Sequence, residues 1–152
     1  MEKNLPVSAG LGGGSADAGA ALRILRRISS TPDDWENIAR RLGADVPACV
    51  ASEMLLGTGV GHDLGQVEND LEGMAVLLVN PRLSLSTQSV FGSWNGRDLG
   101  ALPTGPASHI AQNGRNDLTD SALKICPEIE DVLRCLQRTD PWLSKMSGSG
   151  AT

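Results

Sequence analysis

A glycine-dense segment that runs directly into an amphipathic helix pattern constrains this chain more than any other feature. Residues 6–17 read Pro-Val-Ser-Ala-Gly-Leu-Gly-Gly-Gly-Ser-Ala-Asp. Glycine at 10, 12, 13 and 14 leaves no Cβ atom to block a ligand and permits positive φ, so successive N–H groups can converge on an anion. A helix start behind them adds unpaired N–H groups and the positive end of a helix dipole. Residues 6–16, called the glycine loop below, therefore predict a phosphate-binding site.

Two roles compete for Ser15. Its hydroxyl can cap a helix expected over residues 15–28, or it can reach a phosphate oxygen or a phosphate-bound Mg²⁺. Asp17 is expected in the first helical turn, where a carboxylate is favoured. The segment lacks the Gly-Lys-Ser/Thr of a Walker loop and the G-x-G-x-x-G of a dinucleotide-binding turn. Its alternative interpretation is a flexible loop with a glycine-assisted helix start.

The composition is that of a globular chain with an acidic balance. The 152 residues carry a formal net charge of −5 and are 40% apolar, which suffices for one ordinary core or two small ones. The acidic balance argues against a nucleic-acid partner, because binding a phosphate backbone needs a basic stripe. Positive potential for a phosphorylated ligand must then be local.

The termini and the cysteines bear on the compartment. No apolar run approaches the roughly 18 residues of a membrane span, and the start Met-Glu-Lys-Asn-Leu lacks signal-peptide features. We therefore expect a cytoplasmic protein with no membrane partner. Cys49, Cys126 and Cys135 are odd in number and form no C-x-x-C pair, so we expect reduced, mostly buried thiols with no metal or disulfide role. Nothing in the sequence sets the oligomeric state or a role for His62 or His109.

Helix and turn signals divide the first half of the chain. A second helix is expected from the capping pair Thr31-Pro32 to a stop at Gly43. Residues 54–61 mix apolar residues with glycines, which predicts short strands joined by a turn. The acidic residues 68–72 are expected to be a linker. Gly19, inside the first helix pattern, indicates either close packing against a neighbouring backbone or simple tolerance.

The second half alternates short apolar runs with helix breakers. Residues 75–80 read Ala-Val-Leu-Leu-Val-Asn, which predicts a buried strand. Ser86 or Thr87 is expected to cap a short helix that carries Val90 and Phe91. The further expected elements are a long surface loop at 92–114, helices at 116–123 and after Pro127, and a strand-like run at 143–146.

Three segments, in this order, carry a resemblance to a known family. They are the glycine loop, residues 42–49 (Leu-Gly-Ala-Asp-Val-Pro-Ala-Cys) and residues 146–152 (Met-Ser-Gly-Ser-Gly-Ala-Thr). Together they resemble the GHMP kinases, the superfamily of galactokinase, homoserine kinase and mevalonate kinase. The middle segment resembles the branch that phosphorylates a cytidyl diphosphate alcohol of non-mevalonate isoprenoid biosynthesis. The match extends over nearly the whole chain, including Asn116-Asp-Leu and Pro127-Glu-Ile.

The resemblance implies site roles residue by residue. The glycine loop would bind the phosphates of ATP and Mg²⁺ through Pro6, Val7, Ser8, Ala9, Gly10, Leu11, Gly12, Gly13, Gly14, Ser15 and Ala16, with Ser15 also a candidate Mg²⁺ contact. Asp45 would be catalytic and accept the proton of the attacking hydroxyl. Phe91 would stack on the cytosine ring of the substrate. Gly148, Ser149 and Gly150 would form a substrate-site turn whose backbone approaches the glycine loop.

From the residues alone, structural roles for the same positions stay open. Asp45 also fits a helix cap two residues before Pro47. Phe91 fits core packing on a short helix. Residues 148–150 fit an ordinary tight turn.

The fold implied is α+β, a two-domain GHMP kinase fold. Its N-terminal part is like domain 2 of ribosomal protein S5, and its C-terminal part is a ferredoxin-like α/β sandwich. We assign residues 1–72 to the ATP-binding N-terminal domain and 73–152 to the C-terminal domain, with the active site between them. Whole family members extend further at both ends and carry an N-terminal active-site lysine. We therefore expect the chain to be truncated at both ends, to expose apolar surface and to be inactive alone.

The function implied is ATP-dependent phosphorylation of a hydroxyl on the cytidyl diphosphate small-molecule substrate. One alternative is a homoserine- or mevalonate-type kinase, which would not be expected to carry the pattern at residues 43–47. Another is a non-catalytic nucleotide-binding module.

Overall fold

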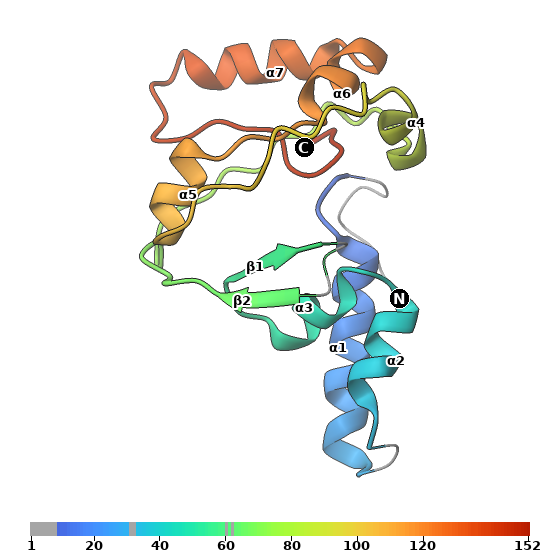
Figure 1. Cartoon of the computed structure of the whole chain (residues 1–152). Helices are drawn as coiled ribbons and strands as arrows, with labels where there is room; N and C mark the ends of the chain where they lie inside the picture. Colours follow the sequence, from blue (N-terminus) through green and yellow to red (C-terminus); the bar gives the residue numbers. More distant parts are fainter. Residues whose placement is uncertain (1–8, 31–32, 60, 62) are drawn as a thin grey trace. The chain divides into compact units, whose positions relative to one another are not determined.

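The chain divides into two compact units. The computed structural model describes residues 9–30, 33–59, 61 and 63–152. Residues 12–70 form one unit, and the described residues 9–11 join residues 71–152 in the other (Figure 1). The chain passes from one unit to the other between residues 70 and 71, and the expected domain boundary was between residues 72 and 73. The assignment of residues 9–11 to the C-terminal unit was not expected, and it divides the glycine loop between the two units.

The unit formed by residues 12–70 contains three helices and a hairpin among its described residues. In chain order these are α1 (Gly13–Ile28), α2 (Trp35–Leu42), α3 (Val46–Ala51), β1 (Leu55–Thr58) and β2 (Asp63–Gln66). The strands are antiparallel, with Leu55 opposite Gln66 and Thr58 opposite Asp63. The predicted strand pair is present, but only β1 lies within the predicted residues 54–61, and β2 follows them. Leu22, Ala39 and Val46, one from each helix, form the buried core.

Helix α1 begins two residues before the expected start. Gly12 is the N-cap in the left-handed region, at φ 62°, and no side chain caps the helix. Ser15 therefore lies within the first turn, and of the two roles left open for it the helix cap is not the one observed. Asp17 lies beyond the first turn, which holds no acidic residue, so the prediction for Asp17 is wrong. The physical reason is that glycine adopts the left-handed conformation without a Cβ penalty, so the chain enters the helix at Gly12.

Helix α2 is capped by Asp34 rather than by the expected pair Thr31-Pro32, which lies outside the described residues. The Asp34 carboxylate accepts from the Asn37 backbone N–H at 3.3 Å and from the Asn37 side-chain amide at 2.8 Å. The helix therefore begins at Trp35. Its predicted end at Gly43 is confirmed.

Gly19 lies where α1 packs against α3. A Cβ atom at Gly19 would lie 2.8 Å from both the carbonyl carbon and the Cβ of Cys49, and 2.9 Å from its carbonyl oxygen. Arg23, one turn further along α1, donates a hydrogen bond to the same carbonyl. Of the two interpretations of Gly19, close packing against a neighbouring backbone is the one observed.

Gly19→Ala is expected to destabilise the unit of residues 12–70 by about 1–3 kcal/mol, because overpacking against a backbone outweighs the gain in helix propensity of about 1 kcal/mol. Urea unfolding followed by circular dichroism measures this change. Gly14→Ala is the matched control, since nothing lies within 4 Å of a Cβ at that position. Equal stability changes in the two variants would contradict the packing argument.

The C-terminal unit contains four described helices around one core. They are α4 (Thr87–Gly92), α5 (Ala107–Asn113), α6 (Thr119–Ile125) and α7 (Glu128–Gln137). The buried core consists of Leu85, Val90, Ala122, Cys126, Ile129, Met146 and Ala151. Ser86 caps α4 as expected, because its hydroxyl accepts from the Ser89 N–H at 3.3 Å. The expected helices near 116–123 and after Pro127 are present as α6 and α7.

The predicted buried strand at residues 75–80 is wrong. The segment pairs in no ladder, and Val76 and Leu77 are 78% and 74% exposed. The expected strand at 143–146 is also absent. Leu77 and Lys145 line the same small cavity of about 60 Å³, so the two extended segments lie near each other. A strand requires a backbone partner in hydrogen-bonding register, and neither segment has one among the described residues.

The long surface loop expected at 92–114 is wrong for residues 107–113, which form α5. Pro106 precedes the helix at φ −59°, a value that suits a helix start. Ala107 is buried and Ile110 and Ala111 are half-buried, at helical spacing. This short apolar pattern after a proline indicates a helix, but the high content of glycine, proline, serine and asparagine in residues 92–114 led to the prediction of a loop.

The cysteines are free thiols with three different exposures. Cys126 is buried, Cys49 is half-buried and Cys135 is exposed, so the expected burial is wrong for Cys135. Burial raises the pKa of the Cys126 thiol, and Glu128, whose Oε2 lies 3.4 Å from Sγ, raises it further. None of the described helices has both the length and the apolar content to cross a membrane.

Candidate functional site

The predicted site residues fall into two groups, one in each unit. Residues 12–16 and Asp45 belong to the unit of residues 12–70. Residues 9–11, Phe91 and residues 148–150 belong to the C-terminal unit. Pro6, Val7 and Ser8 lie outside the described residues. Each group is described by itself.

Gly10, at the start of the described part of the glycine loop, packs tightly against residues 147–150. It has φ +74°, and a Cβ there would lie 2.5 Å from the Ser147 carbonyl oxygen and 2.6 Å from the Gly150 carbonyl oxygen. The Ser147 hydroxyl donates to the Gly10 carbonyl at 2.8 Å. The expected approach of the turn at residues 148–150 to the glycine loop is therefore observed at Gly10.

Residues 146–150, called the C-terminal turn below, are also tied to α4. Ser149 is 6% exposed, and its hydroxyl lies 2.9 Å from that of Thr87, the first residue of α4. Because this hydroxyl is buried and paired, Ser149 acts structurally on the turn. The tie joins the turn to the helix that carries Phe91.

Phe91 lies on the exposed face of α4. Its side chain is 56% exposed, while its neighbour Val90 is fully buried. Core packing, the alternative interpretation of this phenylalanine, does not hold in the structure. An exposed aromatic ring is available for stacking on a planar ligand.

The rest of the glycine loop has a different character. Nothing lies within 4 Å of a Cβ built at Gly12, Gly13 or Gly14. Gly13 and Gly14 open α1, where the first backbone N–H groups have no acceptor within the helix. The open space and the unpaired donors suit an anionic group.

Asp45 occupies the N-cap position of α3 without acting as a cap. Its side chain makes no capping hydrogen bond, and the residue is exposed. Its carboxylate is close enough to Cys49 to act on that thiol. Burial raises the pKa of the Cys49 thiol most, Asp45 raises it further, and Arg23 lowers it.

The residues that could hold Mg²⁺ are few. The described parts of the chain contain no group of three or more histidine, cysteine, aspartate or glutamate side chains placed to hold a metal ion. Ser15 offers one hydroxyl. In phosphoryl-transfer sites Mg²⁺ is usually bound through one or two carboxylates together with the substrate phosphates.

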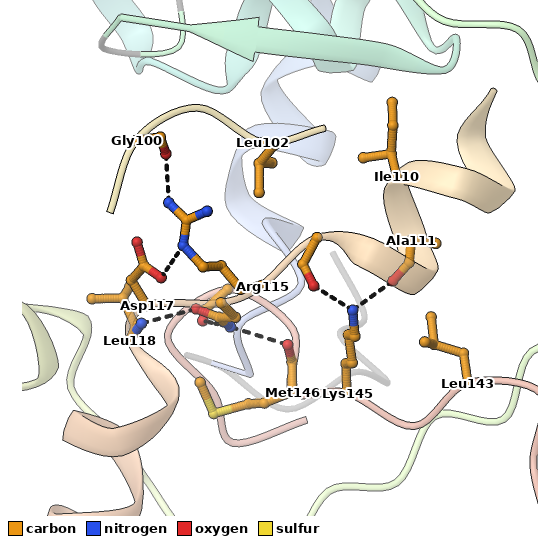
Figure 2. A pocket seen from close by; sticks show the side chains of 13 residues that line it. Gly100, Leu102, Ile110, Ala111, Arg115, Asp117, Leu118, Leu143, Lys145 and Met146 are labelled. Atoms are coloured by element: carbon orange, nitrogen blue, oxygen red, sulfur yellow. Dashed lines mark hydrogen bonds and ion pairs between the residues drawn. The ribbon is translucent and has the colours of Figure 1, made fainter. Parts of the chain in front are cut away.

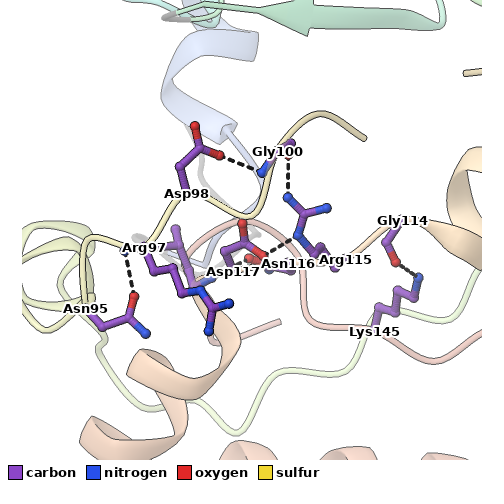
Figure 3. Close-up of polar contacts among 10 residues, drawn as sticks. Asn95, Arg97, Asp98, Gly100, Gly114, Arg115, Asn116, Asp117 and Lys145 are labelled. Atoms are coloured by element: carbon purple, nitrogen blue, oxygen red, sulfur yellow. Dashed lines mark hydrogen bonds and ion pairs between the residues drawn. The ribbon is translucent and has the colours of Figure 1, made fainter. Parts of the chain in front are cut away.

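An open cleft of about 530 Å³ lies in the C-terminal unit beside the C-terminal turn (Figure 2). Lys145 donates to the carbonyls of Ala111 at 2.5 Å and Gly114 at 2.6 Å, at the end of α5. Arg115 donates to the Gly100 carbonyl and pairs with Asp117 at 2.8 Å (Figure 3). Sequence reasoning missed both cations, because the backbone carbonyls that they bind lie 15 or more residues away in the chain. The His109 ring lies within hydrogen-bond distance of its helical neighbour Asn113, and His62 lies outside the described residues.

Comparison with known proteins defines the class. The model of the GHMP kinases N terminal domain matches residues 1–53, and that of the GHMP kinases C terminal domain matches residues 103–152. The two matches together span more than half of the chain. The chain belongs to the GHMP kinases, and the expected α+β fold of that family is confirmed.

Within this family, the chain is similar to kinases of one particular name. The 4-diphosphocytidyl-2-C-methyl-D-erythritol kinase of Erythrobacter litoralis is 64% identical over 156 residues, which cover 100% of this chain and 57% of the relative. The kinase of the same name from Novosphingobium aromaticivorans is 55% identical, with 53% of it covered. A crystal structure of 4-(cytidine 5'-diphospho)-2C-methyl-D-erythritol kinase matches with a TM-score of 0.74 and 28% identity, over 99% of this chain and 57% of that one. The chain thus spans little more than half the length of these relatives.

Proposed function

We propose that this chain supplies the nucleotide loop and part of the substrate site of a kinase that phosphorylates 4-diphosphocytidyl-2-C-methyl-D-erythritol. ATP would donate its γ-phosphate to a hydroxyl of this alcohol and give the 2-phosphate, a step of non-mevalonate isoprenoid biosynthesis in the cytoplasm. The observation that carries the proposal is the glycine loop, in which Gly10 is locked against the C-terminal turn while Gly12, Gly13 and Gly14 face open space.

Phosphoryl transfer requires mainly that two oxygens be held in line and that developing charge be neutralised. The N–H groups at the start of α1 would hold the phosphates, with the Ser15 hydroxyl beside them. Bound Mg²⁺ would neutralise phosphate charge. Asp45 would orient the substrate hydroxyl and accept its proton, and Phe91 would stack on cytosine.

The proposed substrate is tested in a chimera in which this chain replaces the matching residues of the 64% identical Erythrobacter litoralis kinase. We expect ATP-dependent phosphorylation of 4-diphosphocytidyl-2-C-methyl-D-erythritol, detected by ³¹P NMR. Homoserine and mevalonate serve as competing acceptors, since kinases of those types are the alternative members of the family. Preference for either would overturn the assigned substrate.

Phe91→Ala is expected to raise the KM for the cytidyl substrate by roughly tenfold, which corresponds to loss of about 1–3 kcal/mol of base stacking. The KM for ATP should not change. Because Phe91 is 56% exposed, the variant should also unfold at the wild-type urea concentration. Val90→Ala is the control for the helix itself, since it removes a fully buried side chain and should lower stability. An unchanged substrate KM in Phe91→Ala would remove the stacking role.

A second candidate concerns the 152 residues on their own. The chain spans 57% of the Erythrobacter litoralis relative, which favours nucleotide binding without transfer for this part alone. Calorimetry with ATP and Mg²⁺, beside a transfer assay on the same sample, separates the two. Binding without product supports the second candidate, and product formation rules it out.

A further inference from the structure

We infer that Asn116 is a positioning residue for the glycine loop: it holds the C-terminal turn in the place that Gly10 requires, and so sets the affinity for ATP. The part of this inference that concerns ATP rests on the proposed function. In the described part of the chain, the hydrogen bonds of the Asn116 side chain go to the C-terminal turn and to Leu118 and not to the glycine loop, so Asn116 acts through the turn.

The Asn116 side chain uses both ends of its amide. Its Nδ2 donates to the carbonyls of Met146 at 3.0 Å and Gly148 at 2.7 Å. Its Oδ1 accepts from the Leu118 N–H at 3.1 Å, just before α6. One side chain therefore binds the start and the middle of the C-terminal turn and ties them to the start of a helix. Two donors and one acceptor in this arrangement require an amide.

The neighbours of Asn116 are themselves fixed. Arg115 and Asp117, the two sequence neighbours of Asn116, form an ion pair with each other. Arg115 also donates a hydrogen bond to the Gly100 carbonyl (Figure 3). Lys145 anchors the segment that leads into the turn, through its bonds to the last carbonyls of α5 (Figure 2). The backbone on both sides of Asn116, and the residue that precedes the C-terminal turn, are therefore held in place by these contacts.

The C-terminal turn packs closely against the backbone of Gly10 and so fixes its position. A Cβ at Gly148 would lie 2.9 Å from the Gly10 carbonyl oxygen, so the residue that Asn116 binds is one that touches the loop. The Thr152 N–H donates to the Ala9 carbonyl at 3.2 Å, and the Ser147 N–H donates to the Thr152 carbonyl at 2.8 Å. Because close-packed backbones shift together, a displaced turn carries the loop start with it.

The experiment compares Asn116→Ala and Asn116→Asp with the wild-type chain by residue-resolved hydrogen exchange. The Thr152 amide reports directly on the bond to Ala9. We expect its exchange to be about tenfold faster in both variants, because two side-chain hydrogen bonds to the turn are lost. Amides of α7 should keep their wild-type exchange. Asp retains the acceptor for Leu118 and loses only the donors, so it separates a role in the turn from a role in starting α6.

Asn113→Ala is the matched control, since it removes the same amide from α5, where the hydrogen bonds of that amide within the described residues go to His109. Calorimetry with ATP and Mg²⁺ on the same samples should show an affinity about tenfold weaker in both Asn116 variants and unchanged in the control. Wild-type exchange at Thr152 in Asn116→Asp, or faster exchange with unchanged ATP affinity, would overturn the inference. Absence of ATP binding by the wild-type chain would count against nucleotide binding by this chain, while the exchange measurement would still decide whether Asn116 holds the turn.

Discussion

Gly10→Ala is expected to lower the free energy of unfolding of the C-terminal unit by about 2–5 kcal/mol and to abolish detectable ATP binding. Two costs add. The left-handed φ of +74° strains a non-glycine residue by about 1–2 kcal/mol, and a methyl group forced against backbone adds about 1–3 kcal/mol of overpacking. All three close atoms belong to the backbone of Ser147 and Gly150, so no side chain can move aside. Urea unfolding followed by tryptophan fluorescence in a Trp35→Phe background reports on Trp94 and Trp142, both in this unit.

Gly96→Ala isolates the strain from the collision. Gly96 lies in the same unit at φ +72°, and nothing lies within 4 Å of a Cβ there. This variant should lose only the cost of the left-handed conformation, about 1–2 kcal/mol. If Gly10→Ala costs no more than Gly96→Ala, the close approach of the turn has no energetic weight.

Asp45→Asn is expected to reduce turnover by about 10²–10⁴-fold, the usual contribution of a general base, with little change in folding or in ATP affinity. Folding should be spared because the side chain is exposed and makes no capping hydrogen bond. Turnover is measured in the chimera with the Erythrobacter litoralis kinase, and stability is measured on the 152-residue chain. Near-normal turnover would end the assignment of Asp45 as the base.

Glu53→Gln is the control for Asp45→Asn, since it removes another exposed carboxylate shortly after α3 and should leave turnover unchanged. The Cys49 thiol offers an independent check on the Asp45 carboxylate. Because that carboxylate raises the thiol pKa, Asp45→Asn should lower the pKa and speed alkylation of Cys49 at a fixed alkaline pH. The pH profile of alkylation measures the shift.

Local signals predicted the fold where the cause was local. Gly43 ends a helix, Ser86 caps one, and residues 55–58 form the first strand of a hairpin, because each depends on a few consecutive residues. The prediction of a strand at 75–80 was wrong because strand formation depends on a partner that is distant in the sequence. Helix α5 was missed because seven residues among glycine and proline give a weak pattern.

The sequence marked the residues of the candidate site, but it predicted only part of what each residue does in the structure. The glycine pattern marked the loop, but it did not distinguish Gly10, which is needed for packing, from Gly12–14, which leave open space. Asn116 carried no signal beyond its place in a family pattern, since the two carbonyls to which its amide donates lie thirty or more residues away. Contacts at that separation are set by tertiary structure, and one sequence does not reveal them.

The unpaired run at residues 75–80 also sets how the chain behaves in concentrated solution. Val76, Leu77 and Leu78 are 78%, 74% and 55% exposed, on an extended backbone without a ladder. Such a segment is a template for pairing between molecules, and high β-propensity with no charge strengthens the tendency. Glu72 and Pro81 flank the run and act as gatekeepers that limit the length of any pairing. We therefore expect these six residues to lower the colloidal stability of the chain.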